Sequence, residues 1–401
     1  MTTPSHPTDR GVFPEPRGAC PFAPAPAYEQ AREQDPVRRV TLLDGSRPWM
    51  VTRHQDVRSV LADPRFSADA REPGFPFPFA ARKFVLTGEP PFVRLDGAEH
   101  TRQRRMVTRH FTARRTEELR PKVQEITDRV VDAMLAAGDG ADLITAFALP
   151  VPSLVICHLL GVPYEQHDFF QDRSRTLVDH SATPEQTAAG WTDLVGYLEE
   201  LAEARLREPD DGIVSTLVNE EGQTPAQAAA MARVLLVGGH ETSANMAALA
   251  VLALLRHPDQ LAALRAEPAL LPNAVEELLR YVTVVGDPGI PRVAVVDAEI
   301  GGQPIRAGEG VLCMLPVANR DPAVFTTPGA LDLRADARRH VAFGVGAHQC
   351  LGMPLARLEL QIMLGTLLRR LPGLRLAVPF EQLRYRERAL IHGLVELPVM
   401  W

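Results

Sequence analysis

The stretch Phe343-Gly344-Val-Gly-Ala-His348-Gln-Cys350-Leu-Gly352 directly precedes a pattern that predicts a helix over Met353–Leu371. Its glycines permit sharp turns and a close approach of the backbone, and Pro354 suits the first turn of that helix. Cys350 is therefore expected beside the free N–H groups and the positive dipole end of a helix. Because such a setting lowers the pKa of a thiol, it favours a thiolate that can bind a metal.

The other cysteines lie in different surroundings. Cys20, Cys157 and Cys313 are scattered along the chain and form no Cys-x-x-Cys pair. Cys157 and Cys313 stand within apolar stretches, which predicts small core residues. A disulfide scaffold is not expected in a cytoplasmic chain of this size.

The composition indicates a soluble protein with a sizeable core. Apolar residues make up 45% of the 401 residues, and the net charge of −7 gives no reason to expect binding to nucleic acid or an anionic membrane. The polar start, Met1–Arg10, has no signal segment or anchor. The longest apolar run, Met246–Leu255, is far shorter than the roughly 20 residues that a membrane span needs. We expect a cytoplasmic monomer.

Helical periodicity dominates from about residue 98 onward. We predict an irregular, proline-rich surface segment over 1–26 and one mostly helical domain over 27–401. Before residue 98 we expect a hairpin around Asp44-Gly45, a short helix over Gln55–Leu61 and a long loop over Arg71–Pro91. Short strands are expected over Val293–Cys313, with a turn at Gly301-Gly302, and in the tail from Leu374. The other predicted helices span 116–137, 188–207, 226–257, 258–266 and 270–282.

The spacing Phe-Gly-x-Gly-x-His-x-Cys-x-Gly of the cysteine loop resembles the heme-binding loop of the cytochrome P450 superfamily, and the resemblance extends over about 40–401. It implies the mainly α cytochrome P450 fold: a large helical domain with small β-sheets and heme b buried between the long central helix and the cysteine loop. Cys350 would be the axial ligand of the iron, with Phe343, Gly344 and Gly352 around the cofactor. A thiolate ligand favours O–O cleavage. The chain is most similar to soluble actinobacterial-type members.

Glu277 and Arg280 stand three residues apart on one predicted helix face. By itself this spacing is typical of a surface ion pair. Its place about seventy residues before the cysteine loop resembles the Glu-x-x-Arg motif of the family, where the pair is buried and structural. The family usually adds an arginine that Ala330 replaces here, so the sequence leaves open how the pair is completed.

Gly238-Gly239-His-Glu241-Thr242 lies inside the longest predicted helix. Two glycines cost a helix roughly 1 kcal/mol each relative to alanine. The hydroxyl of Thr242 can compete for the carbonyl of Gly238 and open the helix locally. Glu241 and Thr242 resemble the acid and alcohol with which the family guides protons during oxygen activation. The alternative is a packing site of small residues between helices.

The predicted helix around residues 100–111 has two different faces. His100 and Arg104 share its apolar face and match the family's His-x-x-x-Arg motif, which binds the heme propionates. Arg292 and His348 match further propionate positions. An arginine fork can bond both oxygens of a carboxylate, which suits this role.

Arg102, Arg105 and Arg109 share the opposite face of the same helix. They are either a solvated face or a docking site for an acidic electron donor, steered by charge. In soluble bacterial members that donor is usually a ferredoxin, which a ferredoxin reductase reduces.

The resemblance implies a monooxygenase that takes O2 and two electrons, inserts one oxygen atom into an organic substrate and reduces the other to water. By the same resemblance, five largely apolar stretches should line the substrate pocket: 71–93, 168–195, 235–239, 284–290 and 389–394. They favour a hydrophobic or amphipathic substrate, as in natural-product tailoring, antibiotic biosynthesis or xenobiotic oxidation by hydroxylation or epoxidation.

Two alternatives keep the heme. The stretches Asp44-Gly-Ser-Arg-Pro-Trp49 and Leu397-Pro-Val-Met-Trp401 also resemble the fungal branch that reduces nitric oxide with NADH. That branch departs from the usual acid–alcohol pair, so Glu241-Thr242 argues for oxygen activation, and equally against a peroxide-driven enzyme. The second alternative is a heme-binding or sensor protein without catalysis, which would need neither the acid–alcohol pair nor the docking face.

Overall fold

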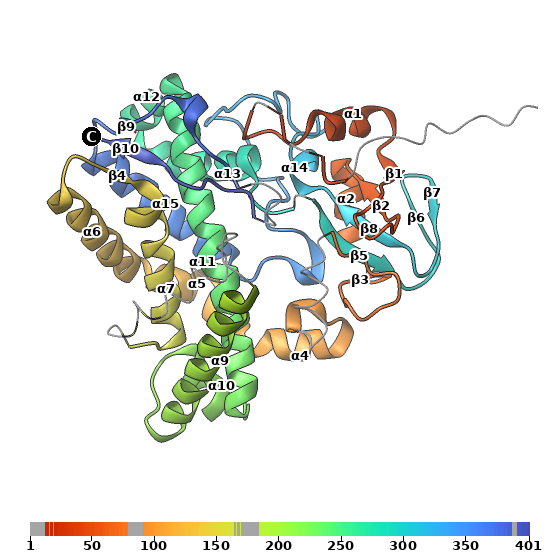
Figure 1. Ribbon diagram of the computed structural model, residues 1–401, viewed down its shortest axis with the longest axis horizontal. Coiled ribbons are helices and arrows are strands. Elements are labelled where there is room, and N and C mark those ends of the chain that lie inside the picture. The colour runs from red at the N-terminus through yellow and green to blue at the C-terminus, as the bar shows by residue number, and fades with distance from the viewer. Residues whose placement is uncertain are drawn as a thin grey trace, which may run out of the picture.

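Most of the long helices gather on one side of the molecule and the five-stranded sheet lies on the other, as the computed structural model shows (Figure 1). The structure describes residues 13–15, 17–18, 20–78, 91–163, 166, 169, 184–286, 288–386 and 391–401. The mainly α architecture that the sequence predicts is confirmed.

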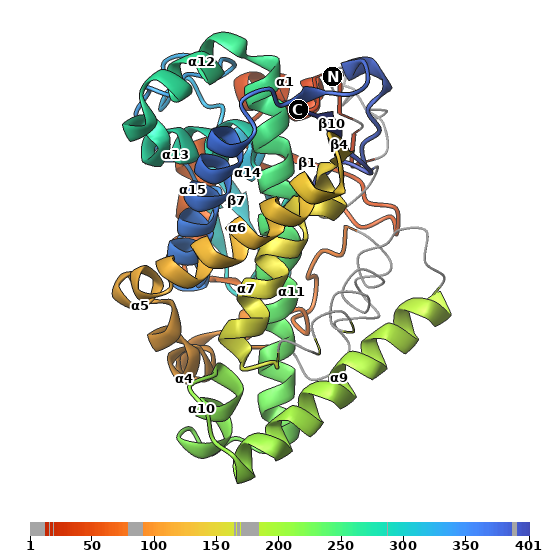
Figure 2. The same ribbon diagram turned by 90° about the vertical axis from the view of Figure 1, so that its left-hand side faces the viewer.

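The central helix is α11, Pro225–Arg256, with 32 residues. It begins with a capping box in which the Thr224 hydroxyl accepts a hydrogen bond from the N–H of Gln227 and the Gln227 side chain accepts one from the N–H of Thr224. Figure 2 shows α11 passing through the middle of the helical part. The helices packed along it are α7 (Pro150–Leu160), α9 (Pro184–Arg207), α13 (Leu271–Val282) and α15 (Met353–Arg370).

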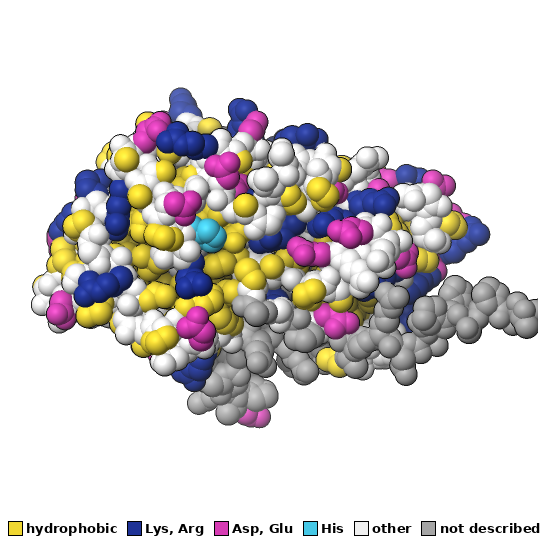
Figure 3. All heavy atoms as spheres, turned by 90° about the horizontal axis from the view of Figure 1, so that it is seen from above, with side chains coloured by type: hydrophobic (Ala, Val, Ile, Leu, Met, Phe, Trp, Pro, Cys, Tyr) yellow, Lys and Arg dark blue, Asp and Glu magenta, His cyan; other side chains and the backbone are white. Residues whose placement is uncertain are grey.

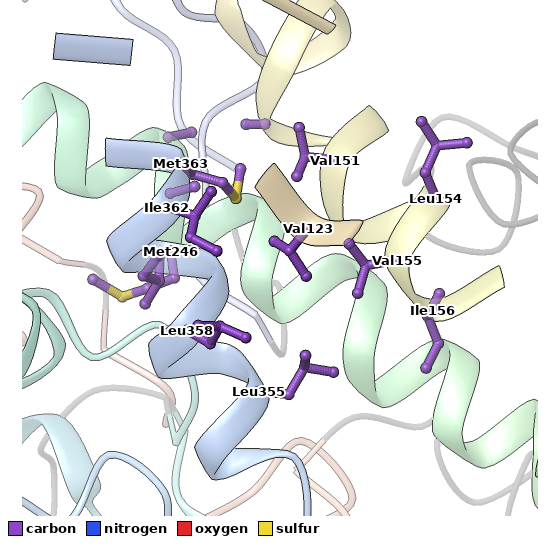
Figure 4. Close-up of a cluster of buried hydrophobic side chains, with 14 of the residues drawn as sticks. Val123, Val151, Leu154, Val155, Ile156, Met246, Leu355, Leu358, Ile362 and Met363 are labelled. Atoms are coloured by element: carbon purple, nitrogen blue, oxygen red, sulfur yellow. The ribbon is translucent and has the colours of Figure 1, made fainter. Parts of the chain in front are cut away.

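The main hydrophobic core lies where α15, α11, α7 and α6 (Arg120–Ala137) meet. Figure 4 shows side chains from these helices pointing toward one another, among them Val123, Val155 and Leu358. Because α11 is buried on nearly all sides through its second half, it is held by packing more than by helix propensity. It therefore offers a rigid support for residues near its middle.

The larger sheet has the strand order β1-β2-β8-β5-β3. Strands β1 and β2 pair antiparallel, which confirms the hairpin around Gly45, and β2 pairs parallel with β8. Gly301 and Gly302, with φ of 56° and 84°, form the predicted turn between β6 and β7. The bounds are β1 Val37–Arg39, β2 Trp49–Val51, β3 Phe66–Ser67, β5 Ile290–Ala294, β6 Ala298–Ile300, β7 Gln303–Ile305 and β8 Gly310–Cys313.

The tail of the chain returns to the helical side. Strand β10 (Pro398–Met400) lies between β4 (Gly140–Asp142) and β9 (Arg375–Leu376), antiparallel to both. The N–H of Trp401 donates to the carbonyl of Asp139 over 3.0 Å. The predicted strands and turns of the tail are therefore confirmed.

Most predicted helices are present within a few residues of their expected bounds, but one predicted helix is divided into two. The stretch 116–137 forms two helices, α5 and α6, that meet at Leu119, just before Pro121. The apolar helix α7 and the short α10 were not predicted. The remaining helices are α1 Pro26–Gln34, α2 His54–Ala62, α4 Gly97–Thr108, α5 Ala113–Glu118, α10 Ile213–Asn219, α12 Pro258–Ala266 and α14 Leu315–Ala318. Shorter turns span Phe92–Arg94, Arg109–Phe111, Ile144–Ala148, Pro268–Leu270, Gly346–His348 and Phe380–Gln382.

The expectation that 1–26 wanders over the surface is wrong for several described residues, two of which are aromatic. Phe13 is 2% exposed and packs against Tyr28, while Phe22 is 4% exposed and packs against Tyr281. Aromatic rings bury a large apolar area and so hold an irregular segment in place.

The described helices include α9, with 24 residues, and α11, with 32. None of them is both long and apolar enough to cross a membrane.

Candidate active site

A cavity of about 570 Å³ lies between the middle of α11 and the loop that precedes α15. Its walls are mostly apolar, with side chains such as Leu235, Val284 and Leu355. Cys350, Thr242 and three of the four residues predicted to bind carboxylates, Arg104, Arg292 and His348, border the same cavity. The structure therefore brings together motifs that are more than one hundred residues apart in the sequence.

The backbone of the cysteine loop is folded tightly toward the cavity. The N–H of Cys350 donates to the carbonyl of Phe343 over 2.8 Å, which closes the loop. Gly344 and Gly346 have φ of 68° and 79°, in the left-handed region that favours glycine. A Cβ at Gly346 would lie 2.6 Å from the carbonyl oxygen of Leu61, so a side chain there would displace the loop from α2.

Cys350 lies two residues before Gly352, the N-cap of α15, and is accessible from the cavity. Burial raises the pKa of its thiol, although N–H groups of Gly352 and Met353 and the charge of Arg104 lower it. The expected fall in pKa is thus wrong for the protein alone, because loss of hydration outweighs the helix terminus. A bound metal ion would remove the proton outright.

The other cysteines follow the sequence-based prediction. Cys157 and Cys313 are buried in the core at 4% and 0% exposure. Burial raises the pKa of each thiol to about 12. Cys20 is at the surface, and no metal-binding group of His, Cys, Asp or Glu side chains occurs among the described residues.

The middle of α11 carries the predicted local hydrogen bond. The hydroxyl of Thr242 donates to the carbonyl oxygen of Gly238 over 2.7 Å, and the helix continues without a break. A Cβ at Gly238 would meet no atom within 4 Å, whereas one at Gly239 would lie 3.4 Å from the side chain of Ile156. Gly238 thus leaves room on the cavity side, and Gly239 lets α7 approach.

Glu241 is buried at 8% exposure. Arg386, in the tail, donates a hydrogen bond from Nη1 to its Oε1 over 2.6 Å. Burial raises the pKa of Glu241 to about 7, although the nearby charge of Arg386 lowers it. A carboxyl group with such a pKa can exchange a proton near neutral pH. Sequence reasoning missed Arg386, because nothing local distinguishes an arginine in an irregular tail.

The four predicted carboxylate-binding residues are brought together. The rings of His100 and His348 lie 4.2 Å apart between centroids. Nη2 of Arg104 donates to the carbonyl of Gln349 over 2.7 Å, and Arg292 is 4% exposed. Burial, followed by the charges of His348 and Arg104, lowers the pKa of His100 to about 4.

This cluster fits a ligand that carries carboxylates. Nε2 of His100 and Nδ1 of His348 are buried and have no hydrogen-bond partner within the part of the chain that the structure describes. Buried polar atoms normally have partners, and Arg104 and Arg292 add positive charge beside them. A thiol, an apolar wall and a cationic edge together match heme, with its iron and its two propionates.

The Glu277–Arg280 pair is buried, at 1% and 3% side-chain exposure, with bonds of 2.6 and 2.7 Å. With Ala330 in place of the family's arginine, the carboxylate of Glu277 accepts a hydrogen bond from the backbone N–H of Asp332 over 3.0 Å. The guanidinium of Arg280 donates to three carbonyl oxygens, those of Asn319, Pro328 and Ala330.

The predicted docking arginines lie on the exposed face of α4 and the turn after it, as expected. Two of the three are held within the chain: Arg102 pairs with Glu99 at 2.6 Å, and Arg109 with Glu220 at 2.8 Å. Figure 3 shows another face of the molecule, seen from above in the view of Figure 1, on which Lys and Arg side chains are interspersed with Asp and Glu.

Glu359 is a cavity residue that sequence reasoning missed. It lies on α15, is 2% exposed and borders the cavity beside Ser243. Burial raises the pKa of its carboxyl to about 8, although a hydrogen bond from Ser243 lowers it. The sequence did offer a signal for this residue: Glu359 is the one acidic residue of α15 and stands among mostly apolar residues.

The predicted substrate-binding stretches contribute unequally. Val93, Leu235, Val237–Gly239, Val284 and Ile290 border the cavity, but 391–394 do not. Ile391 instead pairs with Val285 in a β-bridge. Residues 79–90, 168, 170–183, 287 and 389–390 lie outside the described residues.

Comparisons with known proteins agree with this geometry. The family model described as cytochrome P450 matches residues 191–372. The chain is 56% identical to cytochrome P450-SU2 of Streptomyces griseolus over 382 residues, 95% of this chain and 94% of that protein. It is 47% identical to pentalenic acid synthase of Streptomyces avermitilis over 394 residues, 97% of each.

The crystal structure of GfsF, a cytochrome P450 of Streptomyces halstedii, superposes with a TM-score of 0.94 at 44% identity. The alignment covers 98% of this chain and 100% of that one. The chain therefore belongs to the cytochrome P450 family, whose members bind heme b and whose bacterial monooxygenases put one atom of O2 into a hydrophobic small molecule.

Proposed function

We propose that this chain hydroxylates or epoxidises a hydrophobic natural product or foreign compound with electrons from a ferredoxin. The observation that carries the proposal is the shared cavity: Cys350, Thr242 and a largely apolar wall border one space of about 570 Å³. Pockets of this size take small organic molecules.

The heme would be held by residues from four segments. Cys350 would bind the iron, while His100, Arg104, Arg292 and His348 would bind the propionates. Phe343, Gly344, Gly352 and Gly238 would surround the ring. When bound, the heme supplies oxygen activation, which its thiolate ligand promotes.

Glu241 and Thr242 would handle protons. The buried Glu241 has a pKa of about 7, so it can gain and lose a proton near neutral pH. The Thr242 hydroxyl is fixed by its bond to Gly238 and borders the cavity, where it can hold a proton or a water in a defined place.

The substrate class follows from the cavity wall. Leu235, Val284, Ile290 and Leu315 present apolar side chains, and burying apolar surface is the main source of affinity for such a wall. Pentalenic acid synthase carries a natural product in its name, which supports a tailoring role.

The electron donor would approach the exposed face of α4. Arg105 is exposed there, between the paired Arg102 and Arg109. The three charges would steer an acidic ferredoxin, which a separate reductase would serve. We further propose that the chain acts as a monomer in the cytoplasm.

A reconstitution tests the proposal. The heme-loaded protein is screened by optical titration against terpenoids, polyketides and steroids, since a bound substrate should shift the Soret band. The best binder is then incubated with ferredoxin, ferredoxin reductase and NADPH under O2 labelled with oxygen-18. One labelled oxygen in the product is expected.

Two results would reject it. NADH-dependent consumption of nitric oxide without ferredoxin would favour the reductase alternative, which the Glu241–Thr242 pair disfavours. Tight binding of ligands with no oxygenated product and no ferredoxin-dependent O2 uptake would favour a sensor.

A further inference from the structure

Asp96 occupies the N-cap position of α4 but does not cap the helix. An aspartate at this position usually accepts hydrogen bonds from the first N–H groups of the helix. Here the side chain makes no such bond, and its oxygens turn to other segments. A residue that departs in this way from the usual preference at its position often belongs to a functional site.

One oxygen of Asp96 contacts the cysteine loop. The distance between its Oδ1 and Nε2 of His348 is 3.0 Å, across 252 positions of sequence. The other oxygen, Oδ2, accepts hydrogen bonds from the Ser67 hydroxyl and from the N–H of Ala68, the latter over 3.1 Å. The carboxylate thus joins β3, the start of α4 and the loop that contains Cys350.

The ring of His348 is held on two sides by the same helix. Asp96 contacts its Nε2, and His100, one turn further along α4, packs against its face at 4.2 Å between ring centroids. Its second nitrogen, Nδ1, is buried and lacks a hydrogen-bond partner among the described residues. Since His348 borders the cavity, Nδ1 is the ring atom that is left for a ligand.

The charge of Asp96 suits this role. Although burial raises the pKa of its carboxyl, hydrogen bonds from His348 and Ser67 hold that pKa at about 2. A charged acceptor makes a shorter and stronger hydrogen bond than a neutral one, so Asp96 holds Nε2 of His348 in one direction. The orientation of the ring is then fixed by Asp96.

We propose that Asp96 is a positioning residue for the heme, which acts through His348 by fixing the ring that faces the propionates. The inference rests on the proposed role of His348 in binding those propionates. A partner that orients a ligand-binding histidine commonly changes affinity for the bound group by about tenfold or more when it is removed.

The competing explanation is that Asp96 only fastens β3 to α4. Two variants separate these roles. Asp96→Asn keeps the size of the side chain, but its single oxygen cannot accept from both His348 and the Ser67–Ala68 segment. Ser67→Ala removes the hydroxyl bond to Oδ2 and leaves the contact with His348.

The experiment measures heme release from the loaded protein into excess heme-free myoglobin by absorbance, without turnover. Asp96→Asn should release heme about tenfold faster than wild type, and Ser67→Ala within about twofold of it. In a His348→Gln background, Asp96→Asn should add no further change. Circular dichroism of each variant checks that the fold is kept.

Several outcomes would overturn the inference. Equal effects of Asp96→Asn and Ser67→Ala would assign Asp96 to fastening alone, as would an Asp96→Asn effect that persists beside His348→Gln. If His348→Gln itself left heme release unchanged, the proposed propionate role of His348 would fail, and the inference would fall with it. Fast release from His348→Gln with normal release from Asp96→Asn would reject the inference alone.

Discussion

Arg386 and Glu241 form an ion pair of 2.6 Å between the tail of the chain and the central helix, 145 positions apart. The two side chains are only 17% and 11% exposed. Burial and the cation act in opposite directions on the carboxyl, because burial favours its neutral form and Arg386 favours its charged form. The balance sets the pKa of Glu241 at about 7.

We expect this pair to set the pH dependence of coupled turnover. Glu241 is protonated below about pH 7, so product formed per electron should fall as the pH rises through that value. Arg386→Gln removes the cation, which raises the pKa of Glu241 further and moves the inflection to higher pH. The measurement is the ratio of product to NADPH consumed from pH 6 to pH 9.

The matched control is Glu241→Gln, which has no proton to lose and should flatten the profile. An inflection that stays in place in Arg386→Gln, or survives in Glu241→Gln, would assign the titration to another group.

The hydroxyl of Thr242, and not the shape of its side chain, should determine how much product forms per electron. Thr242→Val keeps the branched side chain but removes the donor to Gly238, while Thr242→Ser retains a donor. We expect product per electron to fall about tenfold or more in the valine variant, with the lost electrons appearing as hydrogen peroxide. Heme content should stay normal in both. A valine variant that remained fully coupled would remove Thr242 from the proton path.

Glu359 should make stability depend on pH. Its carboxyl has a folded pKa of about 8 against an ordinary value of 4.5, so it stabilises the fold below pH 4.5 and loses this contribution as the pH rises toward 8. Glu359→Gln lacks the ionisation. We expect its free energy of unfolding, relative to wild type, to rise by about 3 kcal/mol between pH 5 and pH 8.

Urea unfolding followed by circular dichroism at the two pH values measures this difference. The exposed Glu381 offers a matched control, since Glu381→Gln should show no such change. A Glu359→Gln variant that parallels wild type across the range would contradict the expectation.

The Glu277–Arg280 pair should be needed even without the family's additional arginine. Glu277→Ala leaves a buried guanidinium without its counterion, and we expect a loss of about 3–5 kcal/mol in the free energy of unfolding. Ala330→Arg should change that free energy by less than about 0.5 kcal/mol, because the N–H of Asp332 already donates to the Glu277 carboxylate. A large rise in the free energy of unfolding of Ala330→Arg would contradict this expectation, because it would mean that backbone groups replace the family's arginine poorly.

Periodic and closely spaced patterns were the predictable part of the fold. Amphipathic α13 and the hairpin turn at Gly301-Gly302 were found as expected. Helix α7 was missed because its residues are buried on nearly every side, which removes the periodic signal. The division of 116–137 into α5 and α6 was missed because only one residue, Leu119, separates the two helices.

The same limit applies to the site. Thr242 and Gly238 are four residues apart, so their hydrogen bond could be predicted from the helix alone. Arg386 and Asp96 act on residues 145 and 252 positions away, which only the folded chain reveals. The pKa of Cys350 was misjudged because the loss of hydration at the cavity wall outweighs the effect of the helix terminus.

The ligand assignment of Cys350 is the central claim, and one spectrum tests it most directly. The reduced protein is treated with carbon monoxide, in wild type and in Cys350→His, with Cys157→Ser as a matched control. The account predicts the red-shifted Soret band that gives the family its name in wild type and Cys157→Ser, and its absence in Cys350→His. Survival of that band in Cys350→His would show that another residue binds the iron.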